Sequence, residues 1–343
     1  MDKVNFVQLY TKLTKGVSPK VKNIFDRRFG VKDGEPETLE SIGQSLKITR
    51  ERVRQIEEAG FAQIRKHYGS ALEQIYAQFE AYFAEHGGFK KEEIALTELG
   101  GNAKNKPYIL FFLTIGGDRF SKVCGKKDYD YFWSTLPDSA AHVKQTLANL
   151  VDDIKGHGKL LDRPELVAQF APKYSLNEKA MASYLEVSRK IQENKEGKLG
   201  LVEWPEIKPR GVRDKAFLVF KKEQKPLHFR KIAELIDGMG LSGGNRKAHA
   251  QTVHNELIKD QRFVLVGRGT YALKEWGYVP GTIKEVITRV LKEKNGAPQE
   301  DVVKEVLAQR LVAKNTVLIN LNNKKLFHKD NEGKYFVRET QTA

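Results

Sequence analysis

The sequence predicts a mostly α protein built of serial helix-turn-helix and winged-helix units with short β-hairpin wings. Two patterns predict this class. In the N-terminal third, apolar residues recur at the helical period between capping residues and glycine stops. The rest of the chain repeats one order of elements (helix, helix, helix, hairpin) in stretches of about 65 residues, which suits small domains in series better than a solenoid. At 343 residues, the chain is also too long for one small core.

End signals place the first helices. Ser18-Pro19 predicts a helix start, because serine can cap a helix and proline fits its first turn, and Gly30 predicts the end of that helix. A loop with the turn formers Asp33-Gly34 follows, and then a short helix. The next helix begins at Thr49, and its apolar period continues to about Ala84.

The clearest winged-helix unit lies near residues 210–278. Three helical stretches lead into two alternating strands, Phe263–Val266 and Thr270–Leu273, and strands around a glycine turn predict a hairpin. The same order returns from about Pro280 to the end. A weaker copy covers residues 142–204, with its third helix expected over Glu178 to Gln192.

These patterns divide the chain into five parts. We expect a helix-turn-helix domain at 1–86, a partial winged-helix unit at 87–136, a winged-helix unit with a linker at 137–208, a winged helix at 209–278 and a C-terminal winged-helix-like unit at 279–343.

Composition narrows the class of partner. The formal net charge is +15 and the pI is about 9.5, so the chain attracts polyanions such as DNA, RNA or an acidic membrane. The N-terminus has no apolar signal core, and the longest apolar run, Tyr108–Ile115, is far shorter than a membrane span. We therefore expect a cytoplasmic, nucleoid-associated protein with no membrane partner.

Catalytic and metal-binding patterns are missing from the sequence. The single cysteine, Cys124, cannot form an intramolecular disulfide, and no Cys/His set has zinc spacing. His228, His249 and His254 do not have the spacing of metal ligands, and no Gly-Lys-Ser/Thr follows the glycine-rich loop at residues 238–244. We expect no enzyme, no cofactor, no metal and no small-molecule substrate.

The residues from Thr38 to Glu57 form the most informative motif. Two short helices meet at a tight turn, and the second begins with four outward-facing polar residues, Arg50, Glu51, Arg54 and Gln55. Members of this set are four apart in two pairs, so they form one compact patch where a recognition helix touches base edges. Arginine can bond guanine at two points, glutamine can bond adenine, and glutamate can accept from cytosine. Thr38 and Thr49 can cap the two helices and leave N–H groups for phosphate.

This stretch closely resembles the fourth conserved region of the housekeeping sigma factors of bacterial RNA polymerase. The resemblance runs from Arg28-Phe29-Gly30 through Asp33-Gly34-Glu35-Pro36 to Arg65, and Thr49–Glu57 is its most specific part. It implies base contacts from Arg50, Glu51, Arg54 and Gln55, and backbone contacts from Thr38, Leu39, Thr49 and Arg52. It also implies double-stranded DNA and RNA polymerase, through the β subunit, as partners.

The chain departs from a full sigma factor in one respect. The promoter-melting region of that family would lie upstream of the motif, where about 37 residues stand. The aromatic residues Tyr129, Tyr131, Phe132 and Trp133 lie beside lysines but on the other side of the motif, and packing within a wing is their simpler interpretation.

A second resemblance covers residues 210–278, which look like the HARE-type helix-turn-helix of the polymerase delta subunit and of some chromatin and restriction proteins. It rests on Pro226–Phe229, Thr252-Val253 and the hairpin Gly267–Leu273. Helical period turns Gln251, Thr252 and Asn255 away from the apolar stripe of their helix, and Arg268 lies at a wing tip from which it could enter a minor groove. These four residues are the candidate second DNA contact.

Two functions stay open at this point. The first is a DNA-binding transcription protein, a sigma-like factor or a regulator that acts at promoters with RNA polymerase. The second is a polymerase-associated interaction module without promoter selectivity of its own, whose basic face serves the β subunit or nascent RNA.

Overall fold

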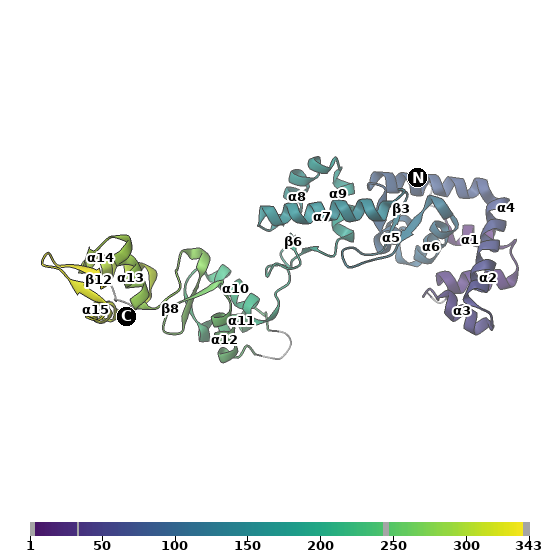
Figure 1. Ribbon diagram of the computed structural model, residues 1–343. Coiled ribbons are helices and arrows are strands. Elements are labelled where there is room, and N and C mark those ends of the chain that lie inside the picture. The colour runs from purple at the N-terminus through teal and green to yellow at the C-terminus, as the bar shows by residue number, and fades with distance from the viewer. Residues whose placement is uncertain (1–3, 33, 243–246, 339–343) are drawn as a thin grey trace. The chain divides into compact units, whose positions relative to one another are not determined.

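The computed structural model describes residues 4–32, 34–242 and 247–338 of the chain. It divides into two compact units, Met1–Glu203 and Trp204–Ala343, each taken by itself below (Figure 1). Helices dominate both units, and within the described residues the strands form four antiparallel sheets of three strands each. The predicted class, mostly α with short hairpin wings, is therefore confirmed.

The first compact unit begins with four helices, and each begins after a residue whose side chain accepts a backbone N–H from the first turn. They are α1 (Phe6–Thr14), α2 (Pro19–Phe29), α3 (Leu39–Leu46) and α4 (Arg50–Glu85), capped by Asn5, Ser18, Thr38 and Thr49. Gly30 ends α2 at φ 70°, the left-handed geometry that glycine adopts without strain. The predicted starts at Ser18 and Thr49 and the stop at Gly30 are confirmed, whereas Asp33 lies outside the described residues.

Helix α4 is bent at Tyr68, where φ is −127° and ψ is 23°. The segments before and after the bend run in different directions (Figure 1). The first segment carries the second helix of the helix-turn-helix. The second segment buries Phe79 and Phe83 in the same hydrophobic core as Phe120 and Trp133. Residues before and after the boundary expected at 86 therefore share one core.

Four winged-helix units follow one plan: helix, strand, two helices and two strands, with the last strand in the middle of each sheet. The first winged-helix unit contains the second segment of α4, β1 (Phe89–Lys91), α5 (Glu92–Gly100), α6 (Lys106–Ile115), β2 (Ser121–Val123) and β3 (Phe132–Ser134). The second contains α7 (Ser139–His157), β4 (Leu161–Asp162), α8 (Arg163–Phe170), α9 (Glu178–Val187), β5 (Ile191–Glu193) and β6 (Lys198–Leu201).

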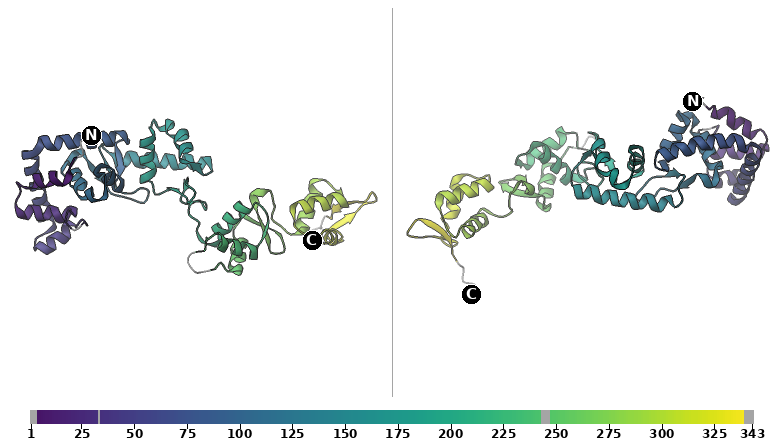
Figure 2. Two further views of the ribbon diagram at one scale, coloured as in Figure 1. Left: turned by 180° about the vertical axis from the view of Figure 1, so that it is seen from behind. Right: turned by 90° about the horizontal axis from the view of Figure 1, so that it is seen from above.

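The other two winged-helix units lie in the second compact unit. The third contains α10 (Gly211–Glu223), β7 (Leu227–His228), α11 (Phe229–Gly238), α12 (Ala250–Lys259), β8 (Phe263–Gly267) and β9 (Thr270–Leu273). The fourth contains α13 (Ile283–Glu293), β10 (Ala297–Pro298), α14 (Gln299–Gln309), α15 (Lys314–Leu321), β11 (Phe327–Lys329) and β12 (Lys334–Val337). Short 3-10 turns are η1 (Ala103–Asn105), η2 (Gly117–Arg119), η3 (Pro172–Tyr174) and η4 (Lys274–Trp276). Figure 2 shows each sheet beside helices of nearly the same colour, which come from the same stretch of chain.

One predicted helix was too long. The helix expected over Glu178 to Gln192 ends at Val187, and Ile191 begins strand β5. Ser188 turns the chain, because its backbone is extended and its Oγ accepts N–H bonds from Lys190 at 3.3 Å and Ile191 at 3.0 Å. A serine that bonds the following backbone in this way competes with helix continuation.

Helix α6 packs against α2 and α4 of the helix-turn-helix domain. Phe111 of α6 is fully buried, and its ring centroid lies 5.4 Å from those of both Phe25 and Phe29. Phe25 in turn stacks on Phe61 of α4 at 4.9 Å. Large aromatic side chains bury much apolar area and prefer such offset and edge-on contacts. This aromatic cluster therefore fixes α2 against the first segment of α4.

Candidate nucleic-acid interface

The turn between α3 and α4 is tight because Gly43 has no side chain. A Cβ at this position would lie 2.7 Å from the carbonyl oxygen of Ile48 and 3.3 Å from the backbone nitrogen of Arg50. Lys47 adopts the left-handed conformation at φ 54°, and the Ile48 N–H donates to the Gly43 carbonyl at 3.0 Å. This closure is a common way to end a helix. It brings the end of α3 directly against the start of α4.

A small apolar cluster holds the two helices together. Ile24, Ile42 and Val53 are fully buried, and Leu39, Leu46, Ile48 and Ile56 pack around them. The cluster takes its residues from α2, α3, α4 and the turn, so the faces opposite to it point to solvent. This apolar cluster thus orients the recognition helix without using the exposed polar residues at its start.

An ion-pair brace on the other side of α3 was not expected from the sequence. Arg27 donates from Nε and Nη2 to the two carboxylate oxygens of Glu37, both at 2.7 Å, and Ser41 Oγ donates to Glu37 at 2.9 Å. These hydrogen bonds, the one from Arg27 above all, lower the pKa of Glu37 to about 2. Arg28 Nη1 adds a bond to the Glu37 carbonyl at 3.0 Å. The brace ties the loop after Gly30 to both α2 and α3.

The inner face of the recognition helix carries a buried acid. Glu57 is 8% exposed, and its Oε1 lies 3.6 Å from Nε of Arg28. Burial raises the pKa of Glu57, and the positive charge of Arg28 acts in the opposite direction. Arg28 and Glu57 therefore join α2 to α4, and they belong to the frame of the motif and not to its outer face.

The outer face of α4 carries the predicted patch. Arg50, Glu51, Arg54 and Gln55 are all exposed in the first two turns of the helix. The structure therefore brings together the four residues for which base contacts were predicted. Whether they touch bases stays a prediction.

The charges of this patch are partly paired along the helix. Arg54 donates to the Glu51 carboxylate from Nε at 3.0 Å and from Nη2 at 2.8 Å, which lowers the pKa of Glu51 and raises the pKa of Arg54. Arg52 Nη1 donates to Oε1 of Gln55 at 3.2 Å. The Arg54 and Glu51 side chains are 56% and 58% exposed, so water screens their attraction and the pair is weak. Base contacts could replace such bonds at little cost.

The residues predicted to contact the DNA backbone lie at the starts of the two helices. Thr38 Oγ1 accepts the N–H of Ser41 at 3.1 Å, and Thr49 Oγ1 accepts the N–H of Arg52 at 3.1 Å. Thr38, Thr49 and Arg52 are exposed. Leu39 is half-buried and its side chain packs in the apolar cluster, so a phosphate contact there falls to its backbone N–H.

The candidate second contact lies on α12 and the following wing. Gln251, Thr252 and Asn255 are exposed, and the Gln251 amide donates to Oδ1 of Asn255 at 3.1 Å. Arg268 is exposed in the turn between β8 and β9. These exposures agree with the predicted orientation of all four residues. Of the glycine-rich loop before this helix, residues 243–246 lie outside the described residues.

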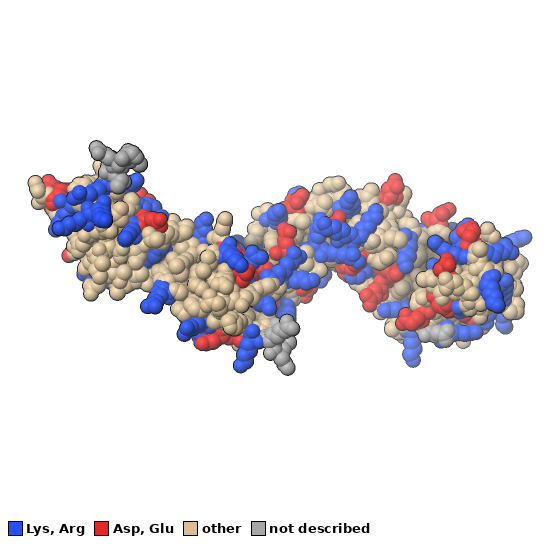
Figure 3. All heavy atoms as spheres, turned by 60° about the horizontal axis from the view of Figure 1, so that its bottom comes forward, with Lys and Arg blue, Asp and Glu red and all other residues tan. Residues whose placement is uncertain are grey.

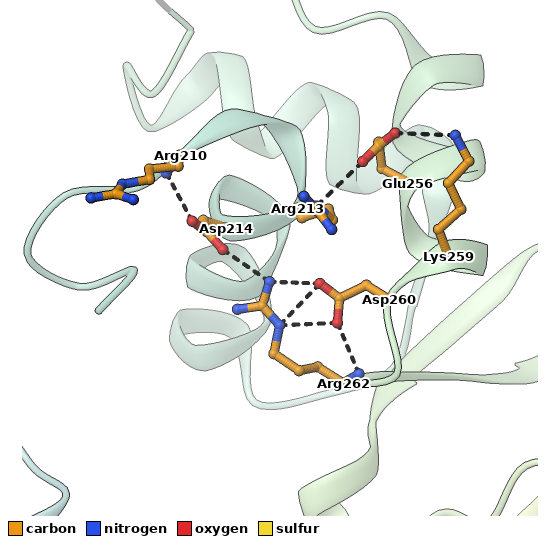
Figure 4. Close-up of polar contacts among 7 residues, drawn as sticks. All are labelled: Arg210, Arg213, Asp214, Glu256, Lys259, Asp260 and Arg262. Atoms are coloured by element: carbon orange, nitrogen blue, oxygen red, sulfur yellow. Dashed lines mark hydrogen bonds and ion pairs between the residues drawn. The ribbon is translucent and has the colours of Figure 1, made fainter. Parts of the chain in front are cut away.

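Charged residues that follow α12 are bonded to residues of α10 (Figure 4). Arg262 donates to Asp260 from Nη2 at 2.7 Å and to Asp214 at 2.9 Å, and its guanidinium lies 5.0 Å from the ring centroid of Phe217. Asp214 also accepts the backbone N–H of Arg210 at 2.8 Å. Asp260, Asp214 and Phe217 engage Arg262 together, so it joins α10 to the start of the wing.

His254 and most of the clustered aromatics also pack within the fold, whereas His249 is exposed. Ring centroids of Phe229 and His254 lie 4.6 Å apart, and the Tyr271 hydroxyl lies 3.1 Å from Nδ1 of His254. Tyr129, Phe132 and Trp133 are at most 3% exposed, as expected for a wing core, whereas Tyr131 is 48% exposed.

The described residues offer little for a metal site or a membrane anchor. Within residues 4–32, 34–242 and 247–338, no group of three His, Cys, Asp or Glu side chains is placed to hold a metal ion. In the same ranges, no helix has both the length and the apolar character needed to cross a bilayer. Cys124 is a free, exposed cysteine.

Both interfaces have the geometry of DNA-binding helix-turn-helix domains, a class in which the second or third helix presents polar side chains outward. Comparison with known families names the two domains. The family described as "Sigma-70, region 4" matches residues 15–66. The HARE-HTH family, whose description ends in "restriction endonuclease HTH domain", matches residues 211–276. The chain therefore contains a sigma-70 region 4 domain and a HARE-HTH domain, and both predicted resemblances are confirmed.

The similarity to whole sigma factors is short. The RNA polymerase sigma factor SigA of Nostoc sp. is 41% identical over 54 residues, which are 16% of this chain and 14% of that protein. SigA of Synechocystis sp. is 43% identical over 49 residues, or 14% of this chain and 12% of that protein. SigA of Lactococcus lactis subsp. cremoris is 41% identical over 49 residues, or 14% of each chain. The matches thus span between about an eighth and a seventh of the length of these relatives.

Proposed function

We propose that this protein binds duplex DNA at promoters together with bacterial RNA polymerase, either as a sigma-like factor or as a regulator. It acts by binding and not by catalysis, and it works at the nucleoid. The α3–α4 motif selects the DNA sequence, and RNA polymerase is approached through its β subunit.

One observation carries this proposal. Arg50, Glu51, Arg54 and Gln55 lie exposed together at the start of a helix that is held by a buried apolar cluster and a brace of hydrogen-bonded charges. Such preorganisation matters, because side chains on a fixed helix meet base edges with little loss of freedom. Arginine, glutamine and glutamate also offer the hydrogen-bonding groups that distinguish base pairs in the major groove.

The test compares base choice with general affinity. Fluorescence anisotropy would measure binding of the full chain to a promoter fragment and to a scrambled duplex. Arg54→Ala should lower the preference for the promoter roughly five- to 150-fold, the range of one lost bidentate base contact. The control Lys66→Ala removes an exposed charge from the same helix outside the patch. It should lower the affinity for both duplexes by the same factor.

The opposite pattern would remove Arg54 from sequence reading. If Arg54→Ala lowers the affinity for promoter and scrambled DNA by the same factor, Arg54 contacts phosphate alone. Affinity that stays constant as salt increases would count against DNA binding altogether, because each neutralised phosphate adds about 0.9 to the salt slope.

The short match to SigA favours a second candidate. Since region 4 similarity covers 14% of that sigma factor, the domain could serve as a docking module of RNA polymerase without promoter choice of its own. The two candidates differ in what the purified protein does alone. A promoter preference without polymerase supports the first function, and binding to polymerase without any promoter preference supports the second.

A further inference from the structure

The third helix of each winged-helix unit occupies the same place in the plan, yet these helices differ in exposure. No residue of α6 is exposed, and in α9 only Glu178 and Lys179 of the first turn are. Lys179 forms an ion pair with Glu85 at the end of α4. In the first compact unit, the third helices therefore serve packing and leave little surface for a ligand.

The last winged-helix unit has the opposite character. Helix α15 exposes Lys314, Asn315 and Ile319, and Ile319 is 74% exposed. Asn315 and Ile319 are four residues apart and share one face of the helix. This face of α15 is therefore not covered by the rest of the unit, unlike α6 and most of α9.

Cations without ion-pair partners surround this helix. Lys314 begins α15, and Lys324 and Lys325 follow its end; all three are exposed. Arg338 is also exposed, and its backbone N–H donates to the carbonyl of Leu326, the residue after Lys325, at 2.8 Å. Among the described residues, none of these four cations forms an ion pair. Figure 3 shows a group of Lys and Arg side chains on the C-terminal part of the chain.

Among the residues of this unit up to Arg338, acidic side chains lie elsewhere or are already bonded. Helix α15 contains none, and Glu285, Glu293, Glu300, Asp301 and Glu305 belong to α13 and α14. At the wing tip, Glu332 pairs with Lys334, and Oδ1 of Asp330 accepts the N–H groups of Glu332 and Lys334. The positive surface is therefore centred on α15 and not on the wing tip.

We propose that α15 is a further DNA-binding helix, which lies in the major groove of duplex DNA with Lys314 and Lys324-Lys325 on the phosphates at its two ends. The dimensions agree. Eight residues make a helix about 12 Å long, close to the major-groove width of about 12 Å. Lysine suits phosphate as a point charge, which fixes register without reading sequence. Asn315 and Ile319 then face the groove floor.

This site lies outside both matched families, which end at residues 66 and 276, and it is independent of the promoter contact proposed above. Its test uses the full chain and a random-sequence DNA duplex at several salt concentrations. The variant Lys314→Gln, Lys324→Gln, Lys325→Gln should lower the slope of log affinity against log salt by about 2–3, because each lost phosphate contact removes about 0.9. Replacing the same three lysines by arginine should preserve the slope.

A matched control comes from the same unit. Lys284→Gln, Lys292→Gln, Lys304→Gln removes three exposed lysines from α13 and α14, and the slope should then stay near that of the parent. Circular dichroism should show that all variants keep their helix content. The α15 variant should also keep the ratio of promoter to scrambled affinity, whereas Arg54→Ala changes that ratio.

Three results would overturn the proposal. One is an unchanged slope in the α15 variant, and another is an equal decrease in the variant and its control. The third is an effect seen with single-stranded RNA but not with duplex DNA, which would assign α15 to RNA.

Discussion

Gly43 is the position where a single methyl group should disturb the recognition motif. In Gly43→Ala the new Cβ would lie 2.7 Å from the backbone oxygen of Ile48. The helix cannot relieve this contact by moving a side chain, because the clashing atom belongs to the backbone of the turn. The turn must therefore open and shift the start of α4, where Arg50 and Arg54 lie.

Two effects of opposite sign decide the size of the loss. Alanine is favoured over glycine inside a helix by about 1 kcal/mol. Overpacking a tight site costs about 1–3 kcal/mol, and contact with fixed backbone belongs to the upper part of that range. The net destabilisation of the motif should be about 1–2 kcal/mol, a roughly five- to 30-fold increase in its local opening.

Hydrogen exchange of the full chain, followed by mass spectrometry, would measure this opening in peptides from residues 38–56. Gly69→Ala in α4 is the matched control, because a Cβ at Gly69 meets no atom within 4 Å. It should gain about 0.5–1 kcal/mol from helix propensity and leave exchange at residues 38–56 unchanged. If Gly43→Ala exchanges no faster than the parent in these peptides, the turn has room for a methyl group and the steric argument is wrong.

Three further outcomes are expected. Arg27 and Ser41 lower the pKa of Glu37 from 4.5 to about 2. The stabilisation from Glu37 is therefore present above about pH 4.5 and lost as the pH falls toward 2. Hydrogen exchange, corrected for intrinsic rates, should show faster exchange at residues 31–41 in that window, and Glu37→Gln should remove this dependence on pH. A parent whose protection stays constant over the window would contradict the assignment. Arg310 is 3% exposed and donates from Nη2 to the carbonyls of Val279 at 2.7 Å and Gly281 at 2.6 Å. Arg310→Ala should therefore destabilise the last winged-helix unit by about 1.5–3 kcal/mol and increase proteolytic cleavage near residue 280. Equal cleavage in variant and parent would show that these bonds are dispensable. Ser188→Ala removes the acceptor of two backbone N–H groups and should destabilise the second winged-helix unit by about 1 kcal/mol, measured by exchange of residues 188–201, with no change there as the contrary result.

Local chemistry determined much of this protein from the sequence alone. Ser18, Thr38 and Thr49 cap helices wherever those helices pack, because a cap bonds the backbone within three residues. Helical spacing likewise places Arg50, Glu51, Arg54 and Gln55 on one face without knowledge of the partner. The hairpin around Gly267-Arg268-Gly269 follows from alternation and a glycine turn. The two recognised domains depend on patterns of this local kind.

Tertiary structure decided which of the similar elements are free to bind. The sequence shows α6 and α15 as short helices of repeated units, but Phe111 of α6 is enclosed by rings from α2 and α4 while Ile319 of α15 stays open. The bend at Tyr68 and the brace between Arg27 and Glu37 also join residues through contacts that no local period encodes. The reason is physical: a helix period shows which face is apolar, but the residues that cover that face come from distant parts of the chain, and only their packing determines what remains for a ligand.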